Sequence, residues 1–187
     1  MLGKIDIMSE LIIILVFVVF IIVFLVFSYN KLVSNKNRME EALAIIDVFL
    51  KKRYDLIPEL VETIKGYSNY EKSVLESVTH CRAEAMQAKI VPDKSVSEEG
   101  LTKALSSLFI NVENYPELKA NTHFLQLQHQ ISEVETDLER ARRYYNGTVR
   151  ENNTFMERFP FNIVSKLFNC KKGDFFTIDA GQKEVPK

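Results

Sequence analysis

An uninterrupted run of Leu, Ile, Val and Phe at residues 11–27 constrains the fold of this 187-residue chain more than any other feature. With Ile7, Met8 and Ser9 it extends to about 20 residues, and a helix of that length spans about 30 Å. A soluble helix keeps one polar face, whereas a helix in lipid satisfies its own backbone hydrogen bonds and can be apolar all round. We therefore predict a transmembrane helix at residues 11–28.

A cleaved signal peptide is the main alternative for this run. Signal peptides have a shorter apolar core, which ends at a cleavage site of small residues. Here the run ends in FSYNKLV, which contains no such site. We therefore favour a permanent anchor.

Basic residues around the run predict its orientation. Lys31, Lys36 and Arg38 follow the run, whereas Lys4 alone precedes it. Basic residues that flank a span tend to stay in the cytoplasm. We therefore predict a single-pass membrane protein, with residues 1–10 on the extracytoplasmic side and the remaining chain in the cytoplasm.

The chain beyond the anchor is predicted to be all-α. It has few glycines and prolines, which favours long helices over a sheet with many turns. Four stretches carry apolar residues at alternating steps of three and four, which is the helical period. These stretches are residues 39–64, 74–88, 101–115 and 124–159.

Pro58 lies inside the first stretch and leaves two alternatives open. The stretch is one long helix that kinks at Pro58, or it is two helices, the second of which starts there. The apolar pattern keeps its phase across Pro58, which favours one helix. Gly66 is a suitable residue to end it.

Short loops are predicted between the stretches. Residues 90–97, IVPDKSVS, are interpreted as a loop, with Ser97 as the N-cap of the third helix and Glu98 and Glu99 in its first turn. Residues 115–121, YPELKAN, form the next loop. Because short loops make consecutive helices antiparallel, we predict that residues 29–160 form an antiparallel up-and-down four-helix bundle with long first and last helices.

The last long stretch has the most regular pattern. From Phe124 to Phe159 its apolar steps alternate between three and four, a heptad pattern that is typical of a coiled coil. Thr148 and Asn152 are polar members of this seam. They either fix its register from the inside or face water near the end of the bundle.

Residues 161–187 are predicted to be an amphipathic piece followed by a polar tail. The piece carries Ile163, Val164, Leu167 and Phe168 on one face. It either lies in the lipid headgroup region or covers the end of the bundle core.

Charge is distributed unevenly along the chain. Residues 140–172 have eight basic and two acidic side chains, whereas residues 58–139 have seven basic and fourteen acidic ones. The cytoplasmic leaflet is negative and attracts basic side chains. The predicted contacts with the membrane surface are Lys31, Lys36, Arg38, Arg158, Lys166, Lys171 and Lys172.

Several segments of the sequence resemble sequences of the LemA family. They include YNKLV at residues 29–33, IDVFLKKRYDLIPELVETIKGYSNYE at 46–71, YPELKAN at 115–121, FLQLQ at 124–128, ARRYYNGTVRENN at 141–153, FP at 159–160 and the final AGQKEVPK. The resemblance covers nearly the whole chain, including the anchor. One departure is Leu43, where we expect the family often to carry Trp, and it concerns only local packing.

The resemblance implies a bacterial, single-pass inner-membrane protein with a helical bundle and no enzyme activity. It also implies that genes of the family often neighbour those of membrane metallopeptidases, and that one branch of the family is linked to magnetosome membranes. The segment at residues 53–67, which resembles the family closely, is interpreted as specifying the kink at Pro58 and the packing around it. A surface for a protein partner is the alternative.

Side chains that support catalysis or cofactor binding are few. A di-metal site in a bundle needs a Glu three positions before a His, and none of His80, His123 and His129 has one. We therefore expect no metal or cofactor. Cys81 is interpreted as an unreactive side chain that is buried in the core. Cys170 is either an unmodified thiol or, beside two lysines, a thiol of lowered pKa or an acylation site. No phosphate-binding loop or nucleophile motif is present.

We therefore predict a non-enzymatic membrane scaffold or adaptor, which presents its bundle to protein partners or to the membrane surface. The alternative is a regulatory or sensory subunit of a membrane complex, such as a membrane peptidase. The expected partners are membrane lipid together with a second copy of the chain or a membrane peptidase. A net charge of −1 argues against nucleic acid.

Overall fold

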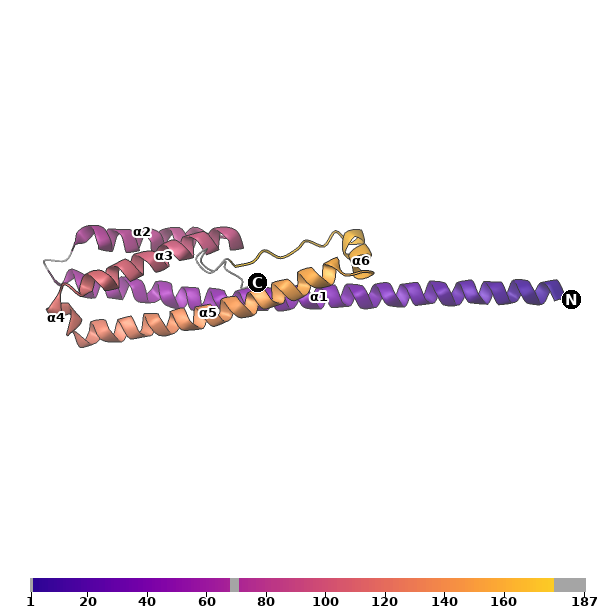
Figure 1. Cartoon of the computed structure of the whole chain (residues 1–187), viewed down its shortest axis with the longest axis horizontal. Coiled ribbons are helices and arrows are strands. Elements are labelled where there is room, and N and C mark those ends of the chain that lie inside the picture. The colour runs from indigo at the N-terminus through magenta and orange to yellow at the C-terminus, as the bar shows by residue number, and fades with distance from the viewer. Residues whose placement is uncertain (1, 68–70, 177–187) are drawn as a thin grey trace, which may run out of the picture. The chain divides into compact units, whose positions relative to one another are not determined.

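The computed structural model describes residues 2–67 and 71–176, with the backbone alone for residues 2–9. Every regular element in these residues is a helix, which confirms the all-α prediction (Figure 1). The tail at residues 177–187, which includes AGQKEVPK, lies outside the described residues. The helices are α1 (Leu2–Lys65), α2 (Lys72–Gln87), α3 (Val91–Val112), α4 (Pro116–Lys119), α5 (Thr122–Glu157) and α6 (Phe161–Leu167).

Packing divides the chain into two compact units. Unit 1 comprises Met1–Glu40 and Thr148–Gly173, and unit 2 comprises Glu41–Gly147 and Asp174–Lys187. The helices α1 and α5 contribute residues to both units. The segment boundaries proposed from the sequence, at residues 10, 28 and 160, divide the chain by composition and remain predictions.

In unit 1, the apolar run lies within α1 and is exposed along its length. Large apolar side chains from Leu11 to Phe27 lie on the surface, and almost none of this stretch is buried. By length and composition, this is the one helix in the described part of the chain that is able to cross a membrane. The arrangement is compatible with membrane anchoring.

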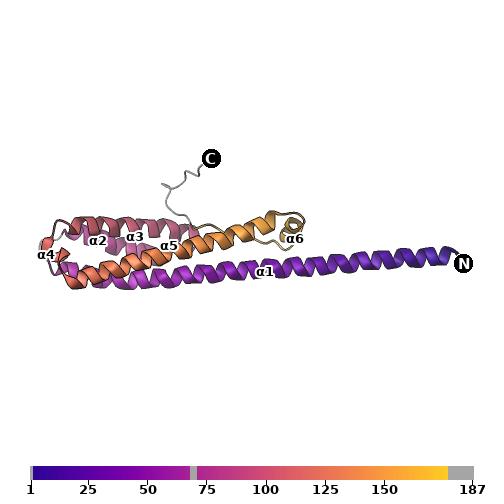
Figure 2. The ribbon, with the colours of Figure 1, turned by 60° about the horizontal axis from the view of Figure 1, so that its bottom comes forward.

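Unit 2 is built around a hairpin of α2 and α3. The two helices run antiparallel and side by side, and the views in Figures 1 and 2 agree on this. Leu75, Val78 and Ala85 of α2 and Leu101, Leu105 and Leu108 of α3 are buried. The α3 residues match the predicted stripe, whereas in α2 Leu75 is buried in place of Val74, with which the predicted stripe begins. From α1, the buried side chains of this unit include Ile46, Leu50, Ile57, Leu60 and Ile64.

The helix α1 is continuous through Pro58 and ends at Lys65, next to Gly66. This confirms the interpretation of one long helix. Pro58 is exposed, so its ring does not occupy the core, and the apolar pattern continues past it because the helix does. The predicted stop at Gly66 is also confirmed.

The loop predicted at residues 90–97 is wrong, because α3 already begins at Val91. Pro92 occupies the first turn, where its missing N–H removes no helical hydrogen bond, so the proline starts the helix instead of breaking it. Ser97 is not the N-cap. Its hydroxyl donates to the carbonyl of Asp93 at 2.9 Å, one turn back inside the helix.

The seam of α5 is confirmed from Phe124 to Asn152. Seven apolar members of the pattern and both polar members, Thr148 and Asn152, are buried, so the polar pair does not face water. The pattern fails at Phe159, whose side chain is 79% exposed, because α5 ends at Glu157. The coiled coil remains a prediction.

Asparagine side chains of α5 hold the segment that follows α6. In unit 1, Asn153 accepts from the N–H of Gly173 at 2.9 Å and donates to its carbonyl at 3.0 Å. In unit 2, Asn146 holds the N–H and the carbonyl of Phe176 in the same way, with both distances 2.8 Å. Each amide thereby satisfies both polar groups of one backbone residue, and the ring of Phe176 is buried.

Candidate membrane-facing site and buried ionic cluster

The short helix α6 is fixed to unit 1 by an apolar cluster. Val164 of α6 is buried with Leu32 of α1 and Met156 of α5. Phe24, Leu25, Phe155 and Cys170 pack against this cluster and are partly buried. Cys170 therefore contributes to packing, and Ser165 closes the same face by donating to the carbonyl of Met156 at 3.1 Å.

Aromatic contacts place α6 at the carboxyl end of the apolar run. The ring of Phe161 stacks on Phe24, which belongs to the run, with centroids 5.7 Å apart. It also stacks on Phe155 at 4.3 Å. Phe168, just after α6, contacts Tyr29, which lies two residues past the run, at 4.8 Å.

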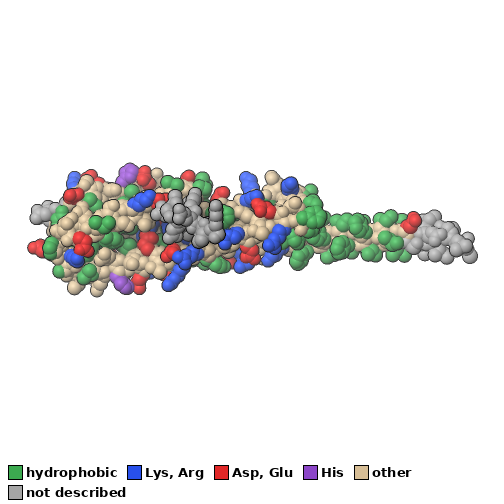
Figure 3. Space-filling view, viewed as in Figure 1, with side chains coloured by type: hydrophobic (Ala, Val, Ile, Leu, Met, Phe, Trp, Pro, Cys, Tyr) green, Lys and Arg blue, Asp and Glu red, His purple; other side chains and the backbone are tan. Residues whose placement is uncertain are grey.

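The outer face of α6 is apolar and exposed. Ile163 and Leu167 lie one turn apart on this face and are exposed, as are Phe159 before the helix and Phe168 after it. Figure 3 shows hydrophobic side chains at α6 that adjoin the hydrophobic surface of the α1 stem. A helix that packs on a soluble domain usually hides its apolar residues, and the exposed face of α6 departs from this pattern.

All seven basic residues predicted to contact the membrane lie in unit 1. Three of them are paired with carboxylates: Lys36 with Glu40 at 3.6 Å, Arg38 with Glu151 at 3.2 Å, and Lys172 with Glu157 at 2.6 Å. The remaining four form no ion pair with any residue that the structure describes: Lys31, Arg158, Lys166 and Lys171.

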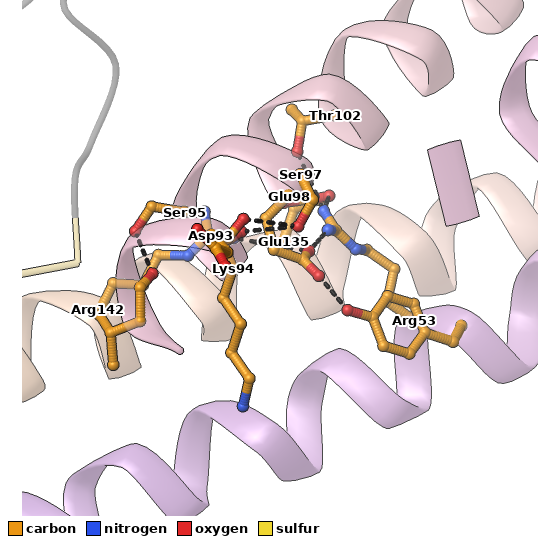
Figure 4. Close-up of polar contacts among 11 residues, drawn as sticks. Arg53, Asp93, Lys94, Ser95, Ser97, Glu98, Thr102, Glu135 and Arg142 are labelled. Atoms are coloured by element: carbon orange, nitrogen blue, oxygen red, sulfur yellow. Dashed lines mark hydrogen bonds and ion pairs between the residues drawn. The ribbon is translucent and has the colours of Figure 1, made fainter. Parts of the chain in front are cut away.

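A cluster of charged side chains lies inside unit 2 and was missed by the sequence analysis (Figure 4). Arg53 of α1 is fully buried and forms ion pairs with Glu98 of α3 and Glu135 of α5. It also donates to the hydroxyl of Thr102 at 3.0 Å. The hydroxyl of Tyr54 donates to the second oxygen of Glu98. One arginine thus joins three helices.

Arg142 of α5 extends the cluster. Its Nη2 lies 4.0 Å from a carboxylate oxygen of Glu98, and its guanidinium lies over the ring of Phe176 at 5.0 Å. Burial, followed by the nearby charge of Arg53, lowers the pKa of Arg142 below its usual range. Burial raises the pKa of the Tyr54 hydroxyl, so Tyr54 stays a donor to Glu98.

The cluster is built to compensate charge, because two arginines face two carboxylates. Removing one partner of a buried ion pair costs about 3–5 kcal/mol, since the other charge is then left without compensation. A weak signal for the cluster exists in the sequence: Arg53 lies three residues after Leu50, and Glu98 three before Leu101, both in phase with buried residues. Glu98, interpreted as a first-turn acid, is 1% exposed in mid-helix.

One further group of possible ligands lies on α2. Potential donor atoms of His80, Cys81 and Glu84 lie within 4.8 Å of one another. His80 and Glu84 are exposed and form an ordinary pair one helical turn apart, at 3.5 Å. Three donors from one helical turn, two of them solvated, hold no preformed metal geometry, so we assign no site here.

Comparison with known proteins adds two findings. A model of the LemA family matches residues 42–187, which is more than half of the chain and begins beyond the apolar run. The chain is also similar to Protein LemA of Metamycoplasma hominis, with 26% identity over 138 residues, which are 73% of this chain and 63% of the relative. The chain thus spans less than two thirds of that relative's length.

Proposed function

The chain belongs to the LemA family, and from this premise we propose that it is a non-enzymatic, membrane-anchored scaffold. In this proposal the apolar run of α1 spans the inner membrane once, with residues 1–10 outside. The helices of unit 2 lie in the cytoplasm as an up-and-down four-helix bundle, which is presented to protein partners.

The observation that carries the proposal is the continuity of α1. The same helix holds the exposed apolar run and, further along, residues such as Ile46 and Leu50 that are buried in the core of unit 2. In this proposal the anchor and a core helix of unit 2 are parts of the same helix. This favours a role in presentation.

The buried cluster supports the same role. Arg53 holds α1, α3 and α5 through charged hydrogen bonds, and such bonds have narrow geometric requirements. The bundle is therefore held in one arrangement, which suits a surface that partners recognise.

Crosslinking in native membranes tests the scaffold proposal. The tagged full chain is crosslinked in intact cells and purified from membranes, and its covalent partners are identified by mass spectrometry. Adducts with defined proteins on unit 2 are expected. A membrane peptidase as the single stable partner would favour the alternative, a regulatory subunit. Recovery of the protein in the soluble fraction would contradict the membrane anchor.

Reporter fusions test the orientation. Alkaline phosphatase, which is active only in the periplasm, is fused after Lys187. No phosphatase activity is expected if unit 2 is cytoplasmic, because three basic residues follow the run and one precedes it. An active fusion would reverse the proposed topology.

A further inference from the structure

We propose that α6 and the residues beside it form a second membrane contact, which lies in the headgroup region and binds anionic lipid. The inference rests on the proposed function, since it takes α1 as the membrane anchor. It names the bilayer itself as the partner of the exposed face of α6.

The first argument is the depth at which α6 lies relative to the membrane. Phe24 belongs to the apolar run and stacks on Phe161, and Tyr29 lies just past the run and contacts Phe168. A helix that crosses the hydrocarbon region brings these two positions to the edge of that region, where Tyr and Trp are enriched. The contacts therefore fix α6 at the boundary between the acyl chains and the headgroups.

The second argument is which side of α6 is buried. Val164 and Ser165 face the protein, whereas Ile163 and Leu167 face outward, and Leu167 is 68% exposed. Helices that lie in the interface bury an apolar face to about 5–10 Å in the headgroup and acyl boundary. The outward face of α6 continues the apolar surface of the α1 stem (Figure 3). One bilayer would therefore cover both surfaces, and no additional protein partner is needed.

The third argument is charge. Unit 1 contains nine Lys and Arg and five Asp and Glu, so it is basic. Its pairs with Glu40, Glu151 and Glu157 neutralise three of the predicted contacts. Three basic residues in or next to α6 form no ion pair with a described residue: Arg158, Lys166 and Lys171. Basic side chains next to an apolar insertion recognise negative headgroups over a screening length of about 8–10 Å.

Depth-dependent quenching tests the contact in the full chain. In a Cys81→Ser, Cys170→Ser background, single cysteines at Ile163 or Leu167 carry a fluorophore, and the protein is reconstituted into vesicles that contain nitroxide-labelled lipid. A label at exposed Asn37 is the control, since it lies ten residues, or about 15 Å of helix, beyond the run. The vesicles are either pure phosphatidylcholine or a mixture with phosphatidylglycerol.

Stronger quenching at both α6 positions than at Asn37 is expected in both kinds of vesicle, because α6 is packed on the α1 stem. Quenching at α6 should be strongest with phosphatidylglycerol and should fall to the phosphatidylcholine level as salt is raised. Quenching at the Asn37 level in every vesicle would overturn the proposal. Equal quenching in both lipids would overturn it too, because the cations would then have no role. Disulfide crosslinking between copies through Leu167→Cys would identify a second chain as the occupant instead.

A pair of charge variants isolates the cations. Lys166→Glu with Lys171→Glu is expected to reduce α6 quenching in the phosphatidylglycerol vesicles to the phosphatidylcholine level. Lys51→Glu with Lys52→Glu changes the net charge equally in unit 2, at two exposed positions, and is expected to leave quenching unchanged. Equal effects of the two pairs would contradict local binding. If the chain stays inserted and α6 is not quenched, the inference fails while the anchored scaffold stands.

Discussion

Arg82 of α2 donates a hydrogen bond from Nε to the backbone carbonyl of Tyr54 in α1, at 2.8 Å. In a regular helix this carbonyl accepts from the N–H of residue 58. Residue 58 is proline, which has no N–H. Arg82 therefore replaces the hydrogen bond that Pro58 removes, and α1 continues through the proline with its acceptor satisfied from the neighbouring helix.

Arg82→Met should reduce the free energy of unfolding by about 1–3 kcal/mol, because a partly buried acceptor loses its partner. The loss should largely disappear in a Pro58→Ala background, where the N–H of residue 58 again serves Tyr54. Urea unfolding of the full chain in detergent micelles, followed by circular dichroism, gives the four values of this cycle. The same loss in both backgrounds would show that Arg82 acts elsewhere.

Glu98→Ala should be much more damaging, with a loss of about 3–5 kcal/mol, because Arg53 remains buried without its main counter-charge. Glu133→Ala is the matched control, since that side chain is exposed on α5 and should change stability by no more than about 0.5 kcal/mol. The same unfolding measurement compares them. Similar small effects would mean that Glu135 alone is a sufficient counter-charge for Arg53.

The buried face of each helix was predictable from the sequence, because the buried residues recur at alternating steps of three and four. The first, third and fourth stripes keep their phase in the structure. The second differs at Leu75, which is buried where Val74 was expected, and at Cys81, which is half-buried where full burial was expected. Helix starts were less predictable. Pro92 and the serines that follow are common in loops, but the same residues are tolerated in the first turn of α3.

The buried cluster could not be recognised from the sequence because charge usually indicates solvent. Arg53 and Glu98 lie in phase with apolar residues, but only the fold shows that they meet. The seven predicted membrane contacts all belong to unit 1. The sequence could not show that Arg38 pairs with Glu151 or that Lys172 pairs with Glu157, because the members of each pair are separated along the chain and only the fold brings them together.

Leu138→Ala should lower stability by about 2–5 kcal/mol, because Leu138 is completely buried in the α5 seam and its removal leaves a cavity. His129→Ala should change stability by about 0.5 kcal/mol or less, since its side chain is 74% exposed. A large loss at His129 in the same unfolding assay would overturn its assignment to the surface.

Asn146→Ala should release the segment around Phe176, because one amide makes both hydrogen bonds to that backbone residue. Each bond contributes about 0.5–1.5 kcal/mol, so the Phe176 amide should exchange its hydrogen faster. Asn114→Ala, at an exposed position, should leave that exchange unchanged. Hydrogen exchange read by mass spectrometry makes the comparison, and unchanged protection in Asn146→Ala would indicate that Phe176 is held by its ring alone.

Stability should fall in strongly alkaline solution, and Tyr54 should account for part of the fall. Burial raises the pKa of its hydroxyl above the ordinary value of 10.0. The unfolded chain therefore releases this proton at a lower pH than the folded chain does. The stabilisation is complete below pH 10.0 and is lost as the pH rises toward the folded pKa, because the folded state then binds more protons than the unfolded state.

The chemistry of the cluster gives the same sign, since a Tyr54 phenolate would lie beside the carboxylate of Glu98 without a proton to share. Tyr54→Phe should lower stability at neutral pH by about 1–3 kcal/mol but flatten the alkaline decline. Tyr144→Phe, at a half-exposed position, should do neither. Urea unfolding from neutral pH to about pH 11 separates them. Tyr145 has a raised pKa from burial as well, so a residual slope is expected in Tyr54→Phe, and an unchanged slope would show that Tyr54 does not titrate with unfolding.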